Sequence, residues 1–571
     1  MSRRVTTPKR DPAAGKLTAE EIVRRLKAHQ EPPGHPQSTV FCKRPDPRQI
    51  RRLKVMFESA GVLPYLERRL RRSGPASRLT VSTLLISKFY VIGEWATYWR
   101  THVANFLASL EPQDAVDLGV QPLDTLLKPI SYYVVAKQSR RLEKALHDGW
   151  TDEDGTHCDL RWFTAAVIRA SVRPRITRMV ENVAMDATAV SSWANGKRPD
   201  GHGGHGLDPD ATHGHCSGNS EREPGGYYGY MLTTCIAVRP WHLTRSTKRV
   251  KFGPAVPPYV VSLIFETATA NVAKTGIDAM EDALHLCPNI SKLVVDRGYS
   301  QLGPSFNRPI HTMNIDIAMD YKEPTRTSVK PVRLGPSGYP AFLHAGTLLH
   351  ACTPPNWRKP PPELKGKELQ DFYTERARRF ALTVHEHLDG GAKKLSSPSR
   401  DGRLNIDPDQ HTGPEGRPLY PPPADLTRIF KDLPQELLHQ GLITAAVENL
   451  DYFQWPPWGT PLHDQVYGQR NPSENIFSQI KDENGLSKKV NRIMGSAARH
   501  IMCLARCVSY NLKLTRKSEE ELKAAKQARR AAKKSRPATD TPEQLEDTDQ
   551  PTSTPPAGEA PDSPARPPPP T

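Results

Sequence analysis

The first part of the chain has the hydrophobic spacing of α-helices. Between residues 17 and 150, apolar side chains recur with helical periodicity and are interleaved with basic ones. Thr18-Ala19-Glu20-Glu21 is a capping box, which predicts a helix start. Further helices are predicted at Arg48–Ala60, Leu63–Arg72 and Thr80–Leu110, the last interrupted near a glycine. Residues 17–150 should therefore form an all-α, basic region.

After about residue 175 the pattern changes to short apolar runs that are typical of strands. A helix is predicted between the third and fourth of these runs, at Gly276–Leu286. The runs are Val183–Val190, Tyr227–Val238, Tyr259–Phe265, Leu293–Val295 and the alternating stretch Met313–Met319. Three strands, a helix and two more strands indicate an α/β sheet with mixed pairing over residues 175–320.

Proline pairs interrupt the pattern between residues 321 and 461. Two short strand-like runs lie within this stretch, at Ala341–His350 and Phe380–His385. We therefore expect residues 321–461 to be an insertion with some β structure.

Helical spacing returns towards the end of the chain, at Pro472–Asp482 and again from about Asn491 to Lys534. Residues 462–515 would then supply the last helices of the core. Residues 516–536 would form a basic helix or tail. The two ends of the chain, with their polar and proline-rich composition, are expected to be disordered at residues 1–16 and 537–571.

Composition narrows the class of protein. The chain has 571 residues, of which 37% are apolar, so it can bury a sizeable core. No apolar run approaches the roughly 20 residues of a membrane helix, and the best candidate, Thr83–Gly93, is interrupted by Lys88. The N-terminal residues lack the apolar stretch of a signal peptide, and eight scattered cysteines make no disulfide framework. We therefore expect a cytoplasmic protein.

Charge gives the first indication of function. The formal net charge is +17. Residues 1–72 hold 18 basic and 7 acidic side chains, and residues 513–536 hold 10 basic and 3 acidic ones. A basic excess at both ends indicates a polyanionic partner such as nucleic acid. The alternative is that these segments are simply solvated.

Two aspartates lie at the ends of predicted strands. Asp186 lies in Val183-Ala184-Met185-Asp186-Ala187-Thr188, and Asp296 follows Leu293-Val294-Val295. A carboxylate at the end of a buried strand is costly unless it is paired or holds a metal, and such positions in α/β sheets are common metal-ligand positions. The alternative for either residue is a turn or a helix cap.

A third motif follows the spacing Tyr-(2)-Arg-(3)-Glu-(6)-Lys. Its residues are Tyr467, Arg470, Glu474 and Lys481. Asn471 is a suitable N-cap, and the following proline suits the first position of a helix. Glu474 and Lys481 would then lie within about 20° of each other on one helical face, next to the apolar stripe of Ile476, Phe477 and Ile480. The alternative is a surface helix with a capping glutamate and an incidental lysine.

Together these motifs resemble those of DDE insertion-sequence transposases, which have an RNase H-like catalytic domain, and in particular the bacterial group that bears the Tyr-Arg-Glu-Lys signature. The resemblance spans about residues 180–515. Asp186-Ala187-Thr188 looks like the first catalytic segment, and Val295-Asp296-Arg297-Gly298-Tyr299 looks like the second. Asp208-Pro209-Asp210-Ala211, followed by Tyr228-Gly229-Tyr230, resembles the stretch that leads to the family's second strand.

The resemblance implies a fold. It implies an α/β RNase H-like catalytic core, which is a mixed sheet flanked by helices, with a β-containing insertion before the last catalytic helix. An all-α N-terminal domain would precede this core, and a disordered C-terminal tail would follow it.

The resemblance also implies the roles of the site residues. The three acids would bind two Mg²⁺ ions, for which Mn²⁺ can substitute; they are Asp186, Asp296 and Glu474. Three signature residues would contact DNA phosphates near the cut; they are Tyr467, Arg470 and Lys481. The basic N-terminal helices would grip the terminal inverted repeats of the element.

The implied activity is that of a DNA transposase, which cleaves and joins DNA at the terminal inverted repeats of its own insertion element by two-metal phosphoryl transfer. Its partners would be the double-stranded DNA of the element ends and of the target, and further copies of the chain in a homodimer or higher oligomer. In a bacterial cytoplasm it would associate with the nucleoid. Two alternatives stay open: an RNase H-like metal-dependent endonuclease without strand transfer, and a catalytically inactive DNA-binding or regulatory protein. The sequence contains no phosphate-loop motif, so we do not expect a nucleotide cofactor.

Three further groups of residues are interpreted as structural. The irregularly spaced, glycine-rich segment His202–Cys216 is expected to be a loop rather than a zinc site. Cys503 and Cys507 are expected to be buried thiols. Asp316 and Asp320, which lie in or next to an alternating strand, are expected to face solvent.

Overall fold

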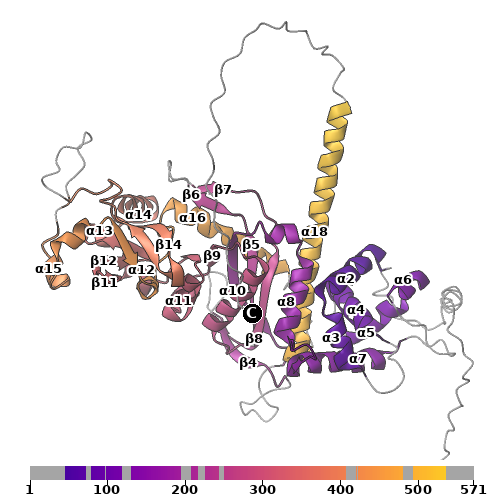
Figure 1. Ribbon diagram of the computed structural model, residues 1–571. Helices are drawn as coiled ribbons and strands as arrows, with labels where there is room; N and C mark the ends of the chain where they lie inside the picture. Colours follow the sequence, from indigo (N-terminus) through magenta and orange to yellow (C-terminus); the bar gives the residue numbers. More distant parts are fainter. Residues whose placement is uncertain are drawn as a thin grey trace, which may run out of the picture. The chain divides into compact units, whose positions relative to one another are not determined.

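A computed structural model describes most of the chain (Figure 1). The described residues are 45–71, 79–96, 98–118, 130–194, 208–216, 225–243, 250–406, 420, 422–479 and 493–534. The capping box at Thr18, both terminal tails and Lys481 therefore lie outside the described residues. None of the helices in the described ranges combines the length and the apolar character that crossing a bilayer requires.

The chain divides into two compact units, Met1–Lys517 and Ser518–Thr571. The described part of the second unit is the C-terminal end of one long helix, α18 (Ser496–Lys534). This helix runs without a break across the boundary expected between residues 515 and 516.

Helices make up the described chain from residue 47 to residue 148, as predicted. Asp46 caps the first of them through the Arg48 N–H, and Gly61, with φ of 69°, ends it. Thr80 likewise caps the helix Val81–Glu94, because its side chain accepts a hydrogen bond from the Thr83 N–H. The helices are α2 (Pro47–Ala60), α3 (Leu63–Leu70), α4 (Val81–Glu94), α5 (Arg100–Ala108), α6 (Pro112–Asp117) and α7 (Tyr132–Asp148).

The apolar helix α4 is almost completely buried, and this includes its one lysine. The Lys88 ammonium lies 2.7 Å from a carboxylate oxygen of Glu143 on α7, and Arg100 lies 2.8 Å from the other oxygen. A buried charge needs such a partner because desolvation is costly. Lys88 therefore joins two helices rather than interrupting one.

A six-stranded mixed sheet follows, so the chain is a mixed α/β protein. The strand order is β10-β9-β3-β5-β4, and β8 pairs with β5 beside β4. Strands β3, β9 and β10 are parallel, whereas β5 is antiparallel to β3, β4 and β8. The strands are β3 (Asn182–Ser191), β4 (Thr212–Cys216), β5 (Gly225–Val238), β8 (Val260–Thr267), β9 (Lys292–Val295) and β10 (Asp316–Met319).

Short elements connect these strands. Before β3 come the strand pair β1 (Trp150–Thr151) and β2 (His157–Cys158), then α8 (Leu160–Ser171) and α9 (Pro174–Thr177); a second pair, β6 (Trp241–Leu243) and β7 (Val250–Phe252), follows β5. The helices between the later strands are α10 (Val272–Leu286), η1 (Tyr299–Gln301) and α11 (Pro304–Thr312). The predicted order of three strands, a helix and two more strands is confirmed in part: β3, β5, β8, α10, β9 and β10 match it, and the sheet has one further strand, β4, before the helix.

Two details of the prediction are wrong. Asp186 lies in the middle of β3 rather than at a strand end, because β3 pairs with β5 along its whole length, from Asn182 to Ser191. The stretch that begins at Met313 was predicted as one strand, but Met313 is the C-cap of α11 and β10 begins only at Asp316. Asn314, with φ of 61°, turns the chain between them.

The two faces of the sheet bury different side chains, because successive strand residues point to opposite faces. One face packs against α10, with Met185 and Met280 in the same core. On the other face, Leu232 and Phe265 pack against Leu504 of α18, in a core that also contains the helices of residues 47–148. The helical region and the sheet therefore share one hydrophobic core.

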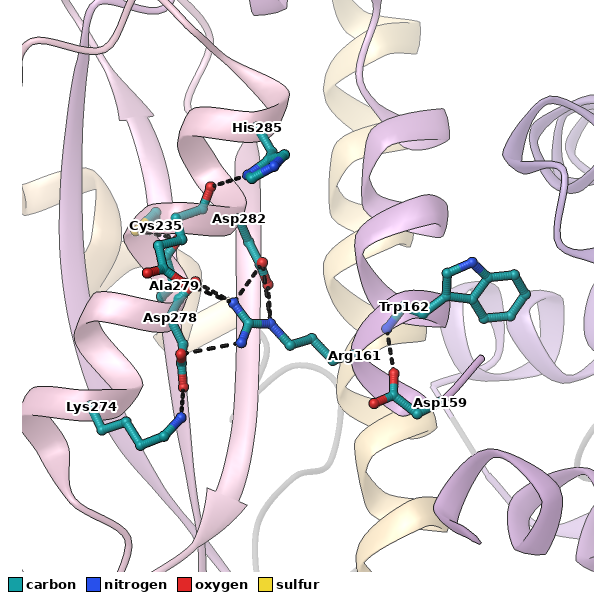
Figure 2. Close-up of polar contacts among 10 residues, drawn as sticks. Asp159, Arg161, Trp162, Cys235, Lys274, Asp278, Ala279, Asp282 and His285 are labelled. Atoms are coloured by element: carbon teal, nitrogen blue, oxygen red, sulfur yellow. Dashed lines mark hydrogen bonds and ion pairs between the residues drawn. The ribbon is translucent and has the colours of Figure 1, made fainter. Parts of the chain in front are cut away.

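Arg161 adds a polar connection between α8 and α10 (Figure 2). Its guanidinium lies 3.1 Å from Asp278 and 3.0 Å from Asp282. Lys274 also contacts Asp278, at 2.5 Å, but it comes from the same helix as its partner. Arg161 is thus the member of this cluster that joins two elements.

The region predicted as an insertion contains two small antiparallel sheets. They are β11 (Val329–Leu334), β12 (Tyr339–His344) and β13 (Thr347–His350), and β14 (Thr383–His387), β15 (Lys393–Ser396) and β16 (Leu442–Ala445). The helices among them are α12 (Glu323–Thr327), α13 (Pro355–Arg358), α14 (Gly366–Phe380) and α15 (Leu426–Ile429), with the short η2 (Asp389–Gly391), η3 (Gln435–His439) and η4 (Val447–Leu450).

Both strand-like runs of this region were bounded wrongly. Ala341–His350 is a hairpin rather than one strand, because Ala345 and Gly346 form a turn with positive φ. Phe380 ends α14, and the strand begins only at Thr383.

The expectation that Asp316 faces solvent is wrong. Lys393 of β15 is buried, and its ammonium lies 2.7 Å from the Asp316 carboxylate at the start of β10. Burial opposes ionisation of Asp316, but His387 and Lys393 together hold its pKa below the usual range. This buried ion pair joins the insertion to the main sheet.

The long helix α18 starts on buried polar anchors. The Asp208 carboxylate accepts hydrogen bonds from Ser192, Tyr230 and the Gly495 N–H, and it pairs with Arg499 at 3.6 Å with both side chains fully buried. Asp210 accepts from the Ser496 N–H at the first residue of α18. The segment singled out at Asp208 and Asp210 therefore positions α18.

Further along α18, two side chains reach neighbouring elements. His500 lies 2.7 Å from the hydroxyl of Thr164 on α8. The Asn511 amide bonds both backbone groups of Val260 on β8, which has β5 as its one strand partner among the described residues. Cys503 and Cys507 are buried thiols, as predicted.

Candidate active site

Asp186 and Asp296 lie next to each other on parallel strands. The last pair of residues in the β3–β9 ladder is Met185 with Val295, so each aspartate is one residue beyond it. Each carboxylate accepts a hydrogen bond from the N–H of the next residue, at 2.8 Å for Asp186 and 2.7 Å for Asp296. The same position in the ladder and the same local hydrogen bond place the two carboxylates side by side.

A helical segment crosses this edge of the sheet. It consists of α16 (Pro461–Tyr467), η5 (Gly468–Arg470) and α17 (Asn471–Ser478), which follow one another without an intervening loop. Asn471 is therefore not an N-cap as expected, because Arg470 before it already has helical φ and ψ. Tyr467, Arg470 and Glu474 are separated by steps of three and four residues, which puts them on one face.

The predicted apolar stripe holds this segment against the sheet. Ile476 and Phe477 are buried in the core that contains Val190 of β3 and Tyr230 of β5. Ile480, the third residue of the stripe, lies outside the described residues. Because α17 is anchored on its apolar side, Glu474 and Arg470 are held next to Asp186 of β3 and to Asp296, which follows β9.

Arg470 contacts all three predicted acids. Its guanidinium lies 3.3 Å from Oδ2 of Asp186, 3.6 Å from Oδ1 of Asp296 and 3.1 Å from Oε1 of Glu474. The Tyr467 hydroxyl lies 3.5 Å from Oδ1 of Asp296. The structure thus brings five of the six predicted site residues together, and the sixth, Lys481, lies outside the described residues.

Burial differs among the three carboxylates, and this sets their electrostatics. Asp186 has a side chain only 14% exposed, and burial raises its pKa to about 6, although Arg470 favours the ionised form. Burial would lower the pKa of Arg470, but the Asp186 and Asp296 carboxylates raise it above its usual value. Burial also raises the pKa of Tyr467, to about 12.

The site contains the kind of oxygen donors that bind divalent metal ions. Across the described residues, however, no three His, Cys, Asp or Glu side chains converge closely enough to enclose a metal ion. The three carboxylates instead meet through the guanidinium of Arg470, a cation that touches an oxygen of each. Carboxylate oxygens are the donors that divalent cations such as Mg²⁺ prefer, and here they already surround one positive group. Asp186, Asp296 and Glu474 would be the residues that hold such a cation.

Asp320 is a neighbour of the site, and it is partly buried instead of facing solvent as expected. It follows Met319, which pairs with Val295, so it is the next aspartate in the same row across the sheet. Its carboxylate accepts a hydrogen bond of 2.9 Å from Trp458 and one of 2.8 Å from the next N–H. The signal was present, because an aspartate follows an apolar strand here as it does at Asp296.

An aromatic pair flanks the site on the same side as Asp320. The rings of His463 and Tyr467 stack with centroids 5.5 Å apart and planes 13° apart. His463 also contacts the carbonyl oxygen of Met319 at 3.0 Å. This contact fixes α16, and with it Tyr467, against β10.

The expectation that the histidine-rich segment is a loop is wrong for its last residues, because Thr212–Cys216 form β4 and pair with β5. His202 and His205 lie outside the described residues, so for them the loop stays a prediction. The ring of His213 packs against Tyr228 with centroids 4.9 Å apart.

A comparison with models of known protein families finds no match, and a comparison with curated proteins finds no relative. The functional argument therefore rests on the residues of the site and on their geometry.

Proposed function

We propose that the chain is a DDE-type transposase that cleaves and joins DNA at the terminal inverted repeats of its own insertion element. The observation that carries the proposal is the convergence of Asp186, Asp296 and Glu474 on one guanidinium. The three residues come from two parallel strands and a helix that are far apart in sequence. They are the three acids on which the resemblance depends.

The fold supports the same proposal. Six strands form one mixed sheet: β3, β4, β5 and β8 precede α10 and pair antiparallel, and β9 and β10 follow it and run parallel to β3. A β-containing region separates this sheet from the helix that carries Glu474. We propose on this basis that the core is RNase H-like.

The proposed chemistry is phosphoryl transfer. A P–O bond forms to water or to a DNA 3′-hydroxyl, and the P–O bond to the leaving oxygen breaks. Two bound Mg²⁺ ions, or Mn²⁺, would activate the attacking oxygen and stabilise the leaving one. Asp186, Asp296 and Glu474 would hold them, while the backbone hydrogen bonds of the two aspartates fix the orientation of the carboxylates.

The proposed partner is double-stranded DNA. The basic excess of the chain suits a polyanion, and Arg470 and Tyr467 would contact backbone phosphates beside the scissile bond. Lys481 would add a point-charge contact. We further propose that the chain acts as a homodimer or higher oligomer on DNA, since two element ends must be joined to one target.

The decisive experiment is a strand cleavage and joining assay on DNA that carries the segments flanking the gene. Wild type is compared with Asp296→Asn and Glu474→Gln, with Mg²⁺ or Mn²⁺ and without either. Metal-dependent cleavage that both substitutions abolish supports the three-acid mechanism, and joined products make the protein a transposase. Cleavage without joining favours the endonuclease. DNA binding without any metal-dependent product contradicts a catalytic role and favours a regulatory DNA-binding protein.

A further inference from the structure

Arg470 occupies an unusual place for a residue that would bind DNA phosphates. Its guanidinium is directed at the carboxylates of the site, and its side chain is only 16% exposed. The contacts involve one oxygen on each of three acids, at 3.1 to 3.6 Å. One positive charge therefore faces three carboxylates.

The oxygens that Arg470 contacts are those that a divalent cation would need. In Asp186, Oδ1 already accepts a hydrogen bond from the Ala187 N–H, and the second carboxylate oxygen, Oδ2, faces Arg470. Oδ1 of Asp296 accepts the Arg297 N–H and also faces Arg470. Carboxylate lone pairs are limited in number, so Arg470 and a cation compete for the same positions.

We propose that Arg470 is the internal counter-ion of the three carboxylates whenever no cation is bound to them, and that cation binding transfers it to the DNA backbone. In the metal-free protein it offsets the repulsion between the carboxylates and keeps the site assembled. When the carboxylates take up a divalent cation, the guanidinium turns towards a phosphate. This inference rests on the proposed function, and it adds a coupling between metal loading and DNA binding.

The position of Arg470 on the helical segment suits both roles. Glu474 is one turn further along and Tyr467 is one turn back, so a change of side-chain rotamer moves the guanidinium while the backbone stays in place. A guanidinium is planar and permanently charged, and it can bind a carboxylate or a phosphate in the same forked manner. By linkage, a cation that displaces Arg470 tightens DNA binding, and DNA tightens cation binding by the same factor.

The first test measures Mn²⁺ binding to the full chain without DNA, by electron paramagnetic resonance of the unbound ion. Arg470→Gln is compared with wild type and with Arg297→Gln. The control removes the same charge next to Asp296, but its side chain has no contact with the three carboxylates among the described residues. We expect Arg470→Gln to bind Mn²⁺ about tenfold more tightly than Arg297→Gln does. Equal or weaker binding by Arg470→Gln overturns the proposal.

Thermal unfolding, measured without metal and with saturating Mn²⁺, shows whether Arg470→Gln is folded and how far the cation stabilises it. Arg470→Gln should unfold at a lower temperature than wild type, and saturating Mn²⁺ should restore more of its stability than it adds to wild type. If the glutamine variant does not fold, Arg470→Lys decides, because it keeps the charge but loses the fork. Tighter Mn²⁺ binding by the lysine variant supports the proposal, and unchanged binding contradicts it.

The second test measures the salt dependence of binding to a DNA duplex, with and without Ca²⁺. In wild type, Ca²⁺ should steepen the slope of log K against log salt by about 0.9, the value of one added phosphate contact. The slope of Arg470→Gln should not change. The two hypotheses fail separately: a chain that never cleaves DNA but shows the Mn²⁺ effect keeps the counter-ion role. A chain that cleaves DNA without that effect keeps the proposed function.

Discussion

Asp186 and Asp296 occupy equivalent positions on neighbouring parallel strands, each one residue beyond the pair Met185–Val295. Their surroundings differ, because β3 continues past Asp186 while β9 ends before Asp296. The Asp186 side chain is therefore 14% exposed and that of Asp296 is 38% exposed. The site thus combines one carboxylate held rigidly inside a sheet with one at the start of a turn.

The row of aspartates provides a matched pair of substitutions. Asp296→Asn should reduce metal-dependent cleavage by at least about a hundredfold, because it removes a charged oxygen donor. Asp320→Asn should cost less than about tenfold, because Asp320 accepts a hydrogen bond from Trp458 and is not one of the three acids paired with Arg470 in the site. Rates of cleavage under single-turnover conditions measure both. Equal losses would mean that Asp320 belongs to the cation-binding group.

Asp208 should be among the most sensitive positions for stability. Asp208→Ala leaves the fully buried Arg499 without its carboxylate and removes the acceptor of two hydroxyls, so the free energy of unfolding should fall by about 3–5 kcal/mol. Asp210→Ala removes the two hydrogen bonds from Ser496, at the first turn of α18, and should cost about 1 kcal/mol. Urea unfolding compares the two. If both variants lose a similar, small amount of unfolding free energy, the buried Asp208–Arg499 pair is not important for stability.

Arg161 should contribute to the attachment of α8 to α10. Its side chain is 42% exposed, so water screens the contacts, and Arg161→Met should lower the free energy of unfolding by about 1 kcal/mol. Lys274→Met removes a pair within one helix and should cost no more than about 0.5 kcal/mol. Amide hydrogen exchange in α8 and α10 should increase in the first variant alone. Equal exchange in both variants would argue against a connecting role.

His500 makes the stability of α18 dependent on pH. It is buried against Thr164, and burial lowers its pKa to about 4. A folded-state pKa below the unfolded value of about 6.5 gives a contribution that is complete above pH 6.5 and is lost as the pH falls towards 4. Between pH 7 and pH 5 this loss should amount to about 2 kcal/mol.

The substitution His500→Gln tests this contribution, because glutamine keeps a polar group near Thr164 but does not titrate. The fall in the free energy of unfolding between pH 7 and pH 5 should be smaller in this variant than in wild type. His285→Gln, on the exposed side of α10, removes one imidazole without removing a buried one and serves as the control. The same pH dependence in all three proteins would contradict the prediction.

Local patterns predicted most of the fold, and they failed where distant residues decide. The strands around Asp186 and Asp296 were found because their apolar runs are buried in the sheet. The partners of Asp316 and Asp208 could not be found, because Lys393 and Arg499 lie far along the chain and no local pattern links them. For the same reason, Asp316 was wrongly expected to face solvent.

The candidate site shows the same division. Helical spacing placed Arg470 and Glu474 on one face, and this was confirmed because the relation lies within one segment. The contact of Arg470 with Asp186 spans 284 residues, so it depends on how the sheet and the insertion fold. The N-cap expected at Asn471 was wrong, because η5 continues the preceding helix up to Arg470 and Asn471 is already the first residue of α17.

Asn511 has a consequence beyond anchoring α18. An outer strand of a sheet offers peptide groups that another chain can bond, which leads to aggregation. The side-chain amide of Asn511 donates to the Val260 carbonyl and accepts from its N–H, as a peptide group of a neighbouring strand would. A single side chain thus imitates an additional strand at this position and leaves Val260 with nothing to offer to a foreign one.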